Sequence, residues 1–423
     1  MKTRWLSYNV GAFLLLVSMA VLSACTAGRL SSDNLNSRFS YGNDLLSPDI
    51  ALYHLSNDSS ELFFSIPEDG LLYKSDAAKF GASLSVHWSL YSSYNSKDVA
   101  DSGTVHYLVT SEVSSGPFRS SFRLPLNRQT GSVLKLDFTD RNRQVSAVRY
   151  LQVAKAGILS SQDFLLTDTL GNALCRNQVS EGEALRIIAP YGNDITWKVR
   201  CYFRNFPLAY LPFRVIDDPV FEMAGDSFFS VKLNPGANIS FQRPGIYFIQ
   251  NDTNTLSGCT VMCFDNEFPK VTRAQQLLEA TRYITTRKEY ERLKAMPDRK
   301  KAIDQFWLET GGNYDRARTL IRAYYNRVQD ANRLYTSYLE GWKSDRGMIH
   351  IIFGQPQSIY RDEETEQWTY NAVVGFPELL FVFRKMNNPF TTNDYSLIRQ
   401  PVYENVWFQA VDQWRQGRVV NDN

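Results

Sequence analysis

Residues 82–90 read Ala-Ser-Leu-Ser-Val-His-Trp-Ser-Leu, and this stretch determines how the N-terminal half of the chain is interpreted. An apolar side chain stands at every second position, and serine or histidine stands between them. This period of two is the signature of a β-strand with one buried side and one side facing water. We therefore predict a half-buried strand at residues 82–90.

Further short stretches of the same kind precede and follow this strand at the spacing of hairpins. They are separated by the turn formers Gly, Asn, Pro and Asp, and comprise residues 61–66, 104–109, 118–124, 133–138 and 145–153. Roughly seven short strands in about 100 residues are typical of an immunoglobulin-like or fibronectin-like sandwich. Residues 48–156 are therefore predicted to form a β-sandwich domain.

The same texture continues in residues 157–266. Apolar side chains alternate with polar ones over residues 195–203, and three more strand-like stretches follow at 228–233, 245–250 and 259–264. We predict a second β-sandwich here. The junction at residues 155–157 is short and has no linker composition, so one larger β domain remains an alternative.

From residue 267 to residue 340 the pattern changes to that of helices. Asp298 precedes a run with helical spacing, and Gly311-Gly312 closes it. The clearest helix has one apolar stripe with steps of three and four, made by Leu320, Tyr324, Val328, Ala331, Tyr335 and Tyr338. Steps of four at Val406, Ala410 and Trp414 predict a last amphipathic helix within residues 402–414.

Between these helices lies a series of short motifs. Gly341-Trp342-Lys343-Ser344-Asp345-Arg346-Gly347 comes first, then a predicted strand at residues 348–353, then Gly354-Gln355-Pro356, and then Glu366-Gln367-Trp368-Thr369-Tyr370. Over roughly residues 270–423 this order of motifs resembles the GWxTD-domain family. Ser344 stands where the family pattern has threonine, so the hydroxyl is kept.

The resemblance implies an uncharacterised envelope protein, usually from Bacteroidota, with β-rich domains ahead of a small α+β module, here residues 341–423. It implies no known reaction, and no catalytic residue is carried over to this chain. The expected architecture is thus multidomain: two β-sandwiches, a helical segment and the α+β module.

The motif residues have two physical interpretations. In the first they form a structural corner: Gly341 and Gly347 bracket a turn that needs positive φ or a close backbone approach, and Asp345 accepts backbone N–H bonds in it. Trp342 anchors the turn, Arg346 pairs with Glu366 or a carbonyl, and Glu366, Trp368 and Tyr370 share one strand face. In the second interpretation the same residues form a pocket, with Arg346 for a carboxylate or phosphate and a carboxyl group as general acid or base.

The N-terminal residues predict the subcellular localisation of the protein. Lys2 and Arg4 precede an apolar run at residues 10–22 that is short for a membrane span, and Leu22-Ser23-Ala24-Cys25 ends it in the order of a bacterial lipobox. We predict that residues 1–24 are a lipoprotein signal peptide and that Cys25 is lipidated, with palmitate among its acyl chains. The residue after it is Thr26 rather than aspartate, which favours an outer-membrane anchor facing the periplasm. The polar residues 25–47 are predicted to be a flexible tether that reaches roughly 25 Å.

Composition and residue spacing exclude several classes of function. Removing Lys2 and Arg4 would leave 44 basic against 44 acidic residues, which does not favour nucleic acid. Metal-binding, phosphate-loop, dinucleotide and nucleophile-elbow motifs are missing from the sequence, and the four histidines, His54, His87, His106 and His350, are scattered. No cofactor, metal or catalytic residue is predicted.

Four cysteines remain beyond Cys25, all in residues 157–266: Cys175, Cys201, Cys259 and Cys263. An oxidising compartment permits disulfides, so buried thiols and cross-strand bridges are both open. If Cys259 and Cys263 share one strand, their Cα atoms lie about 13 Å apart, and they do not bridge each other.

Two functions are compatible with these features. The first is a non-catalytic, lipid-anchored envelope protein that presents its C-terminal module to another envelope protein or to an assembly. The alternative is an enzyme or binding protein that acts on envelope glycans or lipids through Asp345, Arg346 and Glu366. Fold alone does not decide between them.

Overall fold

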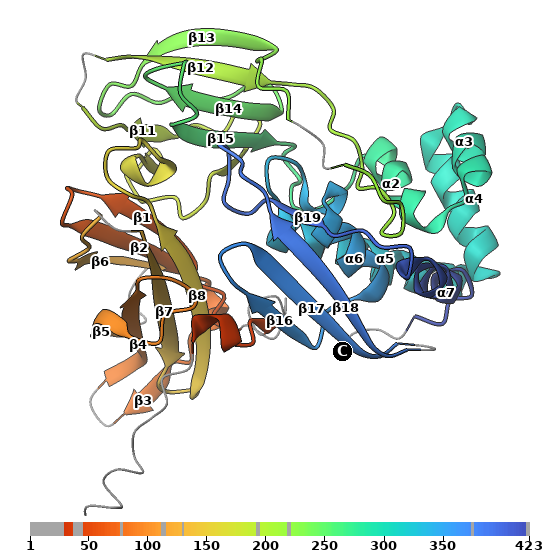
Figure 1. Ribbon diagram of the computed structural model, residues 1–423, viewed down its shortest axis with the longest axis horizontal. Helices are drawn as coiled ribbons and strands as arrows, with labels where there is room; N and C mark the ends of the chain where they lie inside the picture. The colour runs from red at the N-terminus through yellow and green to blue at the C-terminus, as the bar shows by residue number, and fades with distance from the viewer. Residues whose placement is uncertain are drawn as a thin grey trace, which may run out of the picture.

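The computed structural model describes residues 29–36, 45–76, 79–110, 116–128, 131–191, 195–217, 221–373 and 376–419. The predicted signal peptide and Cys25 lie outside these residues. Figure 1 shows three parts: a β domain on one side, a second β domain across the top, and an α+β part that fills the remaining side. Among the described residues no helix is both long and apolar enough to cross a membrane.

The first β domain consists of two antiparallel sheets that share one core. One sheet holds β1 (Asp49–His54), β2 (Ser60–Ile66) and β6 (Phe118–Leu124); the other holds β3 (Lys74–Asp76), β4 (Lys79–Tyr91), β5 (Val99–Thr110), β7 (Ser132–Asp140) and β8 (Val145–Val153). Leu62 and Phe64 of β2 meet Leu84 of β4 and Phe138 of β7 in this core. The strand predicted at residues 82–90 is confirmed as part of β4, with its alternate apolar side chains buried.

The second β domain contains a five-stranded sheet in the order β10-β15-β14-β12-β13 and a two-stranded sheet of β9 and β11. The strands are β9 (Leu165–Thr167), β10 (Gln178–Ser180), β11 (Arg186–Ile188), β12 (Thr196–Tyr202), β13 (Ser227–Lys232), β14 (Gly245–Gln250) and β15 (Cys259–Phe264). All four predicted strands are confirmed. The parallel pairing of β10 with β15 is one feature that the alternation does not predict.

The helices follow as α2 (Ala274–Ala280), α3 (Arg287–Ala295), α4 (Arg299–Gly311) and α5 (Tyr314–Tyr335). Asp298 caps α4 by accepting a bond from Lys301 N at 3.0 Å, and Gly312 ends it at a φ of 74°. The predicted stripe of α5 is buried as far as Tyr335. The helix ends there, so Tyr338 does not belong to it.

The C-terminal part combines a sheet with two helices. It contains η6 (Gly341–Lys343), α6 (Asp345–Phe353), β16 (Ser358–Arg361), β17 (Thr365–Val373), β18 (Phe376–Lys385), β19 (Tyr395–Leu397) and α7 (Tyr403–Arg415), with the strands in sequential order. The expected α+β character and the last amphipathic helix are confirmed.

The strand predicted at residues 348–353 is wrong, because these residues belong to helix α6. Ser344 caps the helix by accepting a bond from Gly347 N at 3.0 Å, and residues 346–352 are all buried. A helix that is buried on every face has no wet side to impose a period on the sequence, so its short apolar run, residues 348–353, reads equally well as a buried strand.

The expectation of a flexible tether over residues 25–47 is also wrong for residues 29–36. These residues include η1 (Leu30–Ser32) and lie between the first β domain and β16. Leu30 and Leu35 are only 2% and 4% exposed. Two leucines are enough to bury part of a polar segment. The prediction of a tether rested on the average composition of residues 25–47, which is polar in spite of these leucines.

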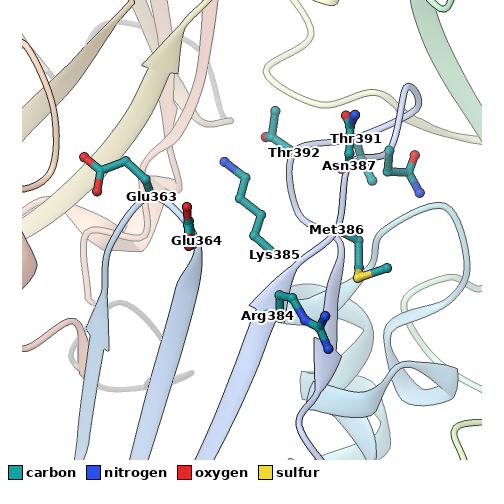
Figure 2. Close-up of a pocket in the computed structure, with 9 residues that line it drawn as sticks. Glu363, Glu364, Arg384, Lys385, Met386, Asn387, Thr391 and Thr392 are labelled. Atoms are coloured by element: carbon teal, nitrogen blue, oxygen red, sulfur yellow. The ribbon is translucent and has the colours of Figure 1, made fainter. Parts of the chain in front are cut away.

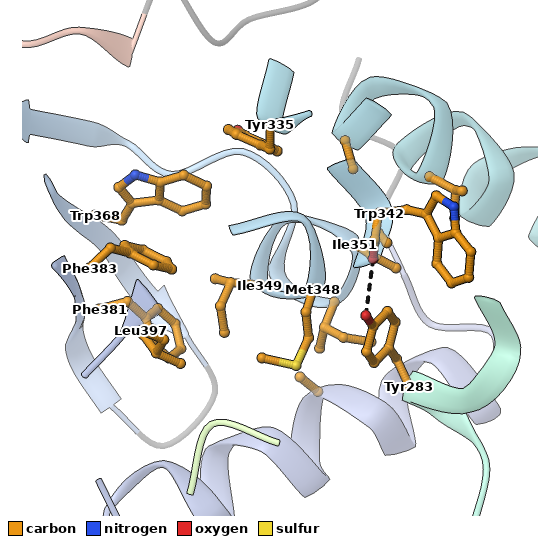
Figure 3. Close-up of a cluster of buried hydrophobic side chains, with 14 of the residues drawn as sticks. Tyr283, Tyr335, Trp342, Met348, Ile349, Ile351, Trp368, Phe381, Phe383 and Leu397 are labelled. Atoms are coloured by element: carbon orange, nitrogen blue, oxygen red, sulfur yellow. Dashed lines mark hydrogen bonds between the residues drawn. The ribbon is translucent and has the colours of Figure 1, made fainter. Parts of the chain in front are cut away.

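One hydrophobic core joins the first β domain to the helices and the C-terminal sheet. It contains Tyr91, Val133 and Tyr150 of the first β domain together with the buried side chains of α2 to α7 and of the C-terminal sheet. Figure 3 shows the centre of this core, where Trp368, Phe381 and Phe383 of the sheet face α6. The second β domain joins through Phe248, whose ring lies 5.2 Å from that of Phe390. The described parts therefore pack as one body.

Candidate functional site

Two glycines allow the backbone to fold tightly between α5 and α6. A Cβ atom on Gly341 would lie 1.9 Å from the carbonyl oxygen of Ala331, and one on Gly347 would lie 1.9 Å from the carbonyl oxygen of Gly341. Neither glycine has a positive φ. Of the two reasons considered for glycine here, close backbone approach is the one that applies.

Trp342 and Ser344 hold this corner from inside. Trp342 is buried, its amide donates to Asn332 Oδ1 at 3.2 Å, and its carbonyl accepts from the Tyr283 hydroxyl at 3.0 Å, as Figure 3 shows. The Ser344 hydroxyl donates to the carbonyl of Gly341 at 2.7 Å while it caps α6. The predicted hydrogen bonding of this hydroxyl is therefore present without the methyl group of threonine.

Lys343 is bound on both sides. Its ammonium group pairs with Glu340 at 2.9 Å and lies over the Trp342 ring. Its carbonyl accepts a bond from Ala209 N at 2.9 Å. Ala209 belongs to the long connection between β12 and β13, so the second β domain reaches over to the motif.

A buried charged network lies next to the corner. Arg346 Nη1 is 3.4 Å from Glu366 Oε1, and Arg361 pairs with the other oxygen of the same carboxylate. Trp368 Nε1 donates to Glu366 at 2.8 Å. Arg346 also donates to the carbonyl and the side-chain oxygen of Asn393, at 2.8 and 2.7 Å.

The network keeps Glu366 ionised. Burial by itself raises the pKa of this carboxyl group, but the charges of Arg361 and Arg346 and the hydrogen bonds lower it to about 2. Arg346 is 1% exposed and Glu366 is 0% exposed. A substrate therefore has no access to either group in this structure.

Asp345, the first residue of α6, is also held by an ion pair and a backbone hydrogen bond. Its carboxylate accepts from Leu397 N at 2.7 Å and pairs with Arg399. The sequence predicted that Asp345 would accept backbone N–H bonds within its own turn. The bond instead goes to β19, so this residue ties the helix to the sheet.

The two later motifs, residues 354–356 and 366–370, lie on the sheet side of this network. Glu366, Trp368 and Tyr370 are buried on one face of β17, as the period of two predicted. The Tyr370 hydroxyl donates to the carbonyl of Gly354 at 2.9 Å. Gly354 ends α6 at a φ of 79°, and the buried Pro356 leads into β16.

His350 lies within the stretch that was predicted to be a strand, and it belongs instead to helix α6. It is buried in α6 beside the Tyr335 ring, with 5.4 Å between ring centroids. Neither of its ring nitrogens has a hydrogen-bond partner among the described residues. Burial, followed by the nearby charge of Arg327, lowers its pKa to about 3.

An open pocket of about 420 Å³ lies just ahead of the motif that begins at Glu366. It is bounded by Glu363 and Glu364 in the β16–β17 turn and by the end of β18 with the loop that follows (Figure 2). Lys385 extends between these walls, and its ammonium donates to Gln152 of the first β domain at 2.9 Å. Burial, and then the charge of Arg361, lowers the pKa of Lys385.

All four cysteines of the second β domain have free thiols. Cys201, Cys259 and Cys263 are buried, and Cys175 is partly buried. Of the two open alternatives, the structure has unpaired thiols. Cys259 and Cys263 share strand β15, as expected. Within the described ranges no group of histidine, cysteine, aspartate or glutamate side chains is arranged to hold a metal ion.

Sequence reasoning missed Arg361 and Arg399, which complete the two ion pairs. A signal for the first was present, because Arg361 and Glu366 flank a turn and are direct cross-strand partners. Arg399 pairs with Asp345, which is far away in the chain, and no local sequence pattern predicts that contact.

The family model described as the GWxTD domain matches residues 245–416. The match begins in β14, ahead of the residue 270 expected from the motifs, so two strands of the second β domain are included in it. No curated protein shows significant sequence similarity to the chain.

Proposed function

Residues 245–416 of this chain belong to the GWxTD domain family, and from this premise we propose that the protein is a non-catalytic lipoprotein of the bacterial cell envelope. Residues 1–24 act as its signal peptide, and lipid on Cys25 anchors it in the outer membrane of a Bacteroidota-type cell, facing the periplasm. Two β domains of immunoglobulin-like type hold the GWxTD domain for contact with another envelope protein.

The observation that carries this proposal is the burial of the motif. General acid–base chemistry and ligand binding both need groups that a substrate can reach. Arg346 and Glu366 neutralise each other inside the protein, and Asp345 is paired with Arg399. The motif therefore acts as a packing corner, and the working surface lies elsewhere on the molecule.

An exposed sheet edge supports contact with a protein partner. Strand β13 ends the five-stranded sheet, and Phe228 on it is 79% exposed. Arg200 is the cross-strand partner of Phe228, and Lys198 and Lys232 lie further along the same face of β12 and β13. A free edge with an exposed aromatic ring can pair with an extended segment of another chain, and the two lysines favour an acidic one.

Crosslinking tests the partner. A photo-crosslinking residue replaces Phe228 in cells, and Leu170, an exposed apolar side chain of the same domain that is not on β13, serves as the matched control. We expect one protein of constant size at position 228, none at 170, and loss of the product when Ser230→Pro blocks strand pairing at the edge. Capture of abundant porins alone, equally at both positions, would contradict the proposal.

Metabolic labelling tests the anchor. An alkyne analogue of palmitate should label the wild-type chain, and Cys25→Ala should abolish the label. Labelling that persists in the variant would rule out Cys25 as the lipidated residue.

The alternative, an enzyme or binding protein for envelope glycans or lipids, has one observation in its favour. The pocket beside Lys385 offers cations, carboxylates, hydroxyls and amides in a volume that suits a small polar ligand. Titration calorimetry with soluble peptidoglycan fragments tests it, with Lys385→Ala as the control variant. Heat of binding that Lys385→Ala removes would favour this alternative over a purely protein-binding role.

A further inference from the structure

The described chain begins at Arg29 already attached to the C-terminal sheet. Leu35 N donates to the carbonyl of Ile359 at 2.8 Å, and Asn34 Oδ1 accepts from Ile359 N at 3.0 Å. Ile359 lies on β16, the edge strand of that sheet. We call residues 29–36 the N-terminal strap, since they run along this edge like part of a further strand.

The other side of the strap is bound to the first β domain. Asp33 accepts from the ammonium group of Lys135 at 3.0 Å and from the Tyr150 hydroxyl at 2.8 Å. Ser31 N donates to the carbonyl of Tyr94 at 2.9 Å, and its hydroxyl donates to Asn95 at 2.8 Å. Together with the burial of Leu30 and Leu35, these bonds fix the place where the chain emerges at Arg29.

The strap limits how far a lipid on Cys25 can be from the folded protein. Only four residue steps separate Cys25 from Arg29, and a fully extended chain spans at most about 3.6 Å per residue, or about 14 Å here. The acyl chains lie in the bilayer and Cys25 at its surface. Arg29 can therefore lie no more than about 14 Å above the lipid headgroups.

We propose that the face of the molecule around the strap, formed by Arg29, Ser31, Ser93 and Asn95, lies against the phospholipid headgroup layer. This inference rests on the proposed lipidation of Cys25. A body held by so short a segment cannot place a surface that is remote from Arg29 against the membrane. In Figure 1 the red N-terminal segment lies between the first β domain and β16, and β13 lies away from it at the outer edge of the second β domain. The exposed Phe228 edge is therefore expected to lie further from the bilayer than the strap, where a partner would be met.

The test compares two positions for their distance from the lipid. Lys97→Cys, an exposed position two residues beyond Asn95, and Phe228→Cys are each prepared in the full lipidated chain with Cys175→Ser, because the other three native thiols are buried. Each protein carries the same thiol-linked fluorophore and is reconstituted in phosphatidylcholine–phosphatidylglycerol vesicles with nitroxide-labelled headgroups. We expect most of the signal at position 97 to be quenched and little of the signal at position 228. Equal quenching, or stronger quenching at 228, would overturn the proposed orientation.

A longer anchor segment provides the control for the mechanism. Inserting 20 Gly and Ser residues between Gly28 and Arg29 raises the typical reach to roughly 25–30 Å and the maximum much further. The difference in quenching between the two positions should then shrink. If the difference persists, the short anchor is not its cause and the inference fails.

Failure of the anchor itself would look different. A chain that does not float with vesicles, and whose Cys25 has an unmodified mass, would refute the lipoprotein proposal, and the orientation with it. A chain that floats but shows equal quenching would refute the orientation alone.

Discussion

Glu366 accepts hydrogen bonds from the side chains of Arg346, Arg361 and Trp368. Two arginines face one carboxylate, so the carboxylate is what makes their burial tolerable. A charge that is buried without a partner loses its hydration, and no ion pair or hydrogen bond compensates for that loss. The Glu366 carboxylate therefore has a structural role, which is to neutralise two buried arginines. Replacing Glu366 tests this role directly.

Glu366→Ala should destabilise the protein by about 3–5 kcal/mol, since it leaves two buried arginines without their counter-charge. Chemical denaturation of the lipid-free chain measures the loss. Asp304→Ala is the matched control: Asp304 also pairs with a cation, Lys300, but both side chains are mostly exposed, so the cost should be under about 1 kcal/mol. A loss at Glu366 no larger than that at Asp304 would mean that the network is a functional site and not a structural one.

His350 should make the protein sensitive to mild acid. Its pKa falls from 6.5 to about 3 on folding, so between these values only the unfolded chain takes up the proton. The free energy of unfolding then falls by up to about 1.4 kcal/mol per pH unit as the pH drops below 6.5. His54, with a pKa lowered to about 4 by burial and then by Arg128, adds a second contribution of the same sign.

Unfolding curves at pH 7 and pH 5 measure this effect. His350→Leu should reduce the difference between the two curves, and His350→Leu combined with His54→Gln should reduce it further. An unchanged pH dependence in His350→Leu would show that the imidazole is hydrated or paired in solution.

The corner between α5 and α6 is the element on which the GWxTD motif acts. Its two glycines face backbone atoms, which cannot move aside as the end of a side chain can. Gly341→Ala should therefore cost about 1–3 kcal/mol or more. In Gly131→Ala the new Cβ would meet only the side chain of Lys155, with Cε nearest at 3.1 Å, and the flexible lysine can move aside. Comparable melting temperatures for the two variants would contradict the backbone contact at Gly341.

Some helices and strands of this fold can be predicted from the sequence, and others cannot. Half-buried strands such as β4 and amphipathic helices such as α5 were predicted, because one wet face imposes a period on the sequence. Helix α6 was missed because every face of it is buried. Its N-terminal cap, Ser344, and the glycine at its end, Gly354, were the remaining signals, and neither was recognised as a helix boundary.

The candidate site divides in the same way. Glu366 and a backbone carbonyl were the two partners predicted for Arg346, and the structure has both. The contacts of Asp345 with Leu397 and of Lys343 with Ala209 join segments far apart in the chain, and no local pattern encodes them. The strap was missed because its polar residues suggested a tether, while its two leucines supply the burial.

At the scale of the whole molecule, the strap and the shared core determine how many units unfold. Leu30 and Leu35 belong to the same hydrophobic cluster as Tyr91 of the first β domain and Trp368 of the C-terminal sheet. Domains that share a core of this kind lose it together, so the lipid-free chain should show one dominant transition in scanning calorimetry.

Replacing both leucines with aspartate should divide that transition. Each substitution places a charge in a buried apolar site, so the strap should detach. The first β domain should then lose the link to β16 that the strap provides. Its own core, built from Leu62, Phe64 and Leu84, does not include the strap and should still unfold cooperatively, now at a different temperature from the C-terminal part. Leu170→Asp, which alters an exposed leucine, controls for the added charge and should keep the single transition. If the strap variant also retains one transition, the direct contacts of Tyr91, Val133 and Tyr150 are enough to couple the domains, and the strap serves only to place the chain's emergence at Arg29.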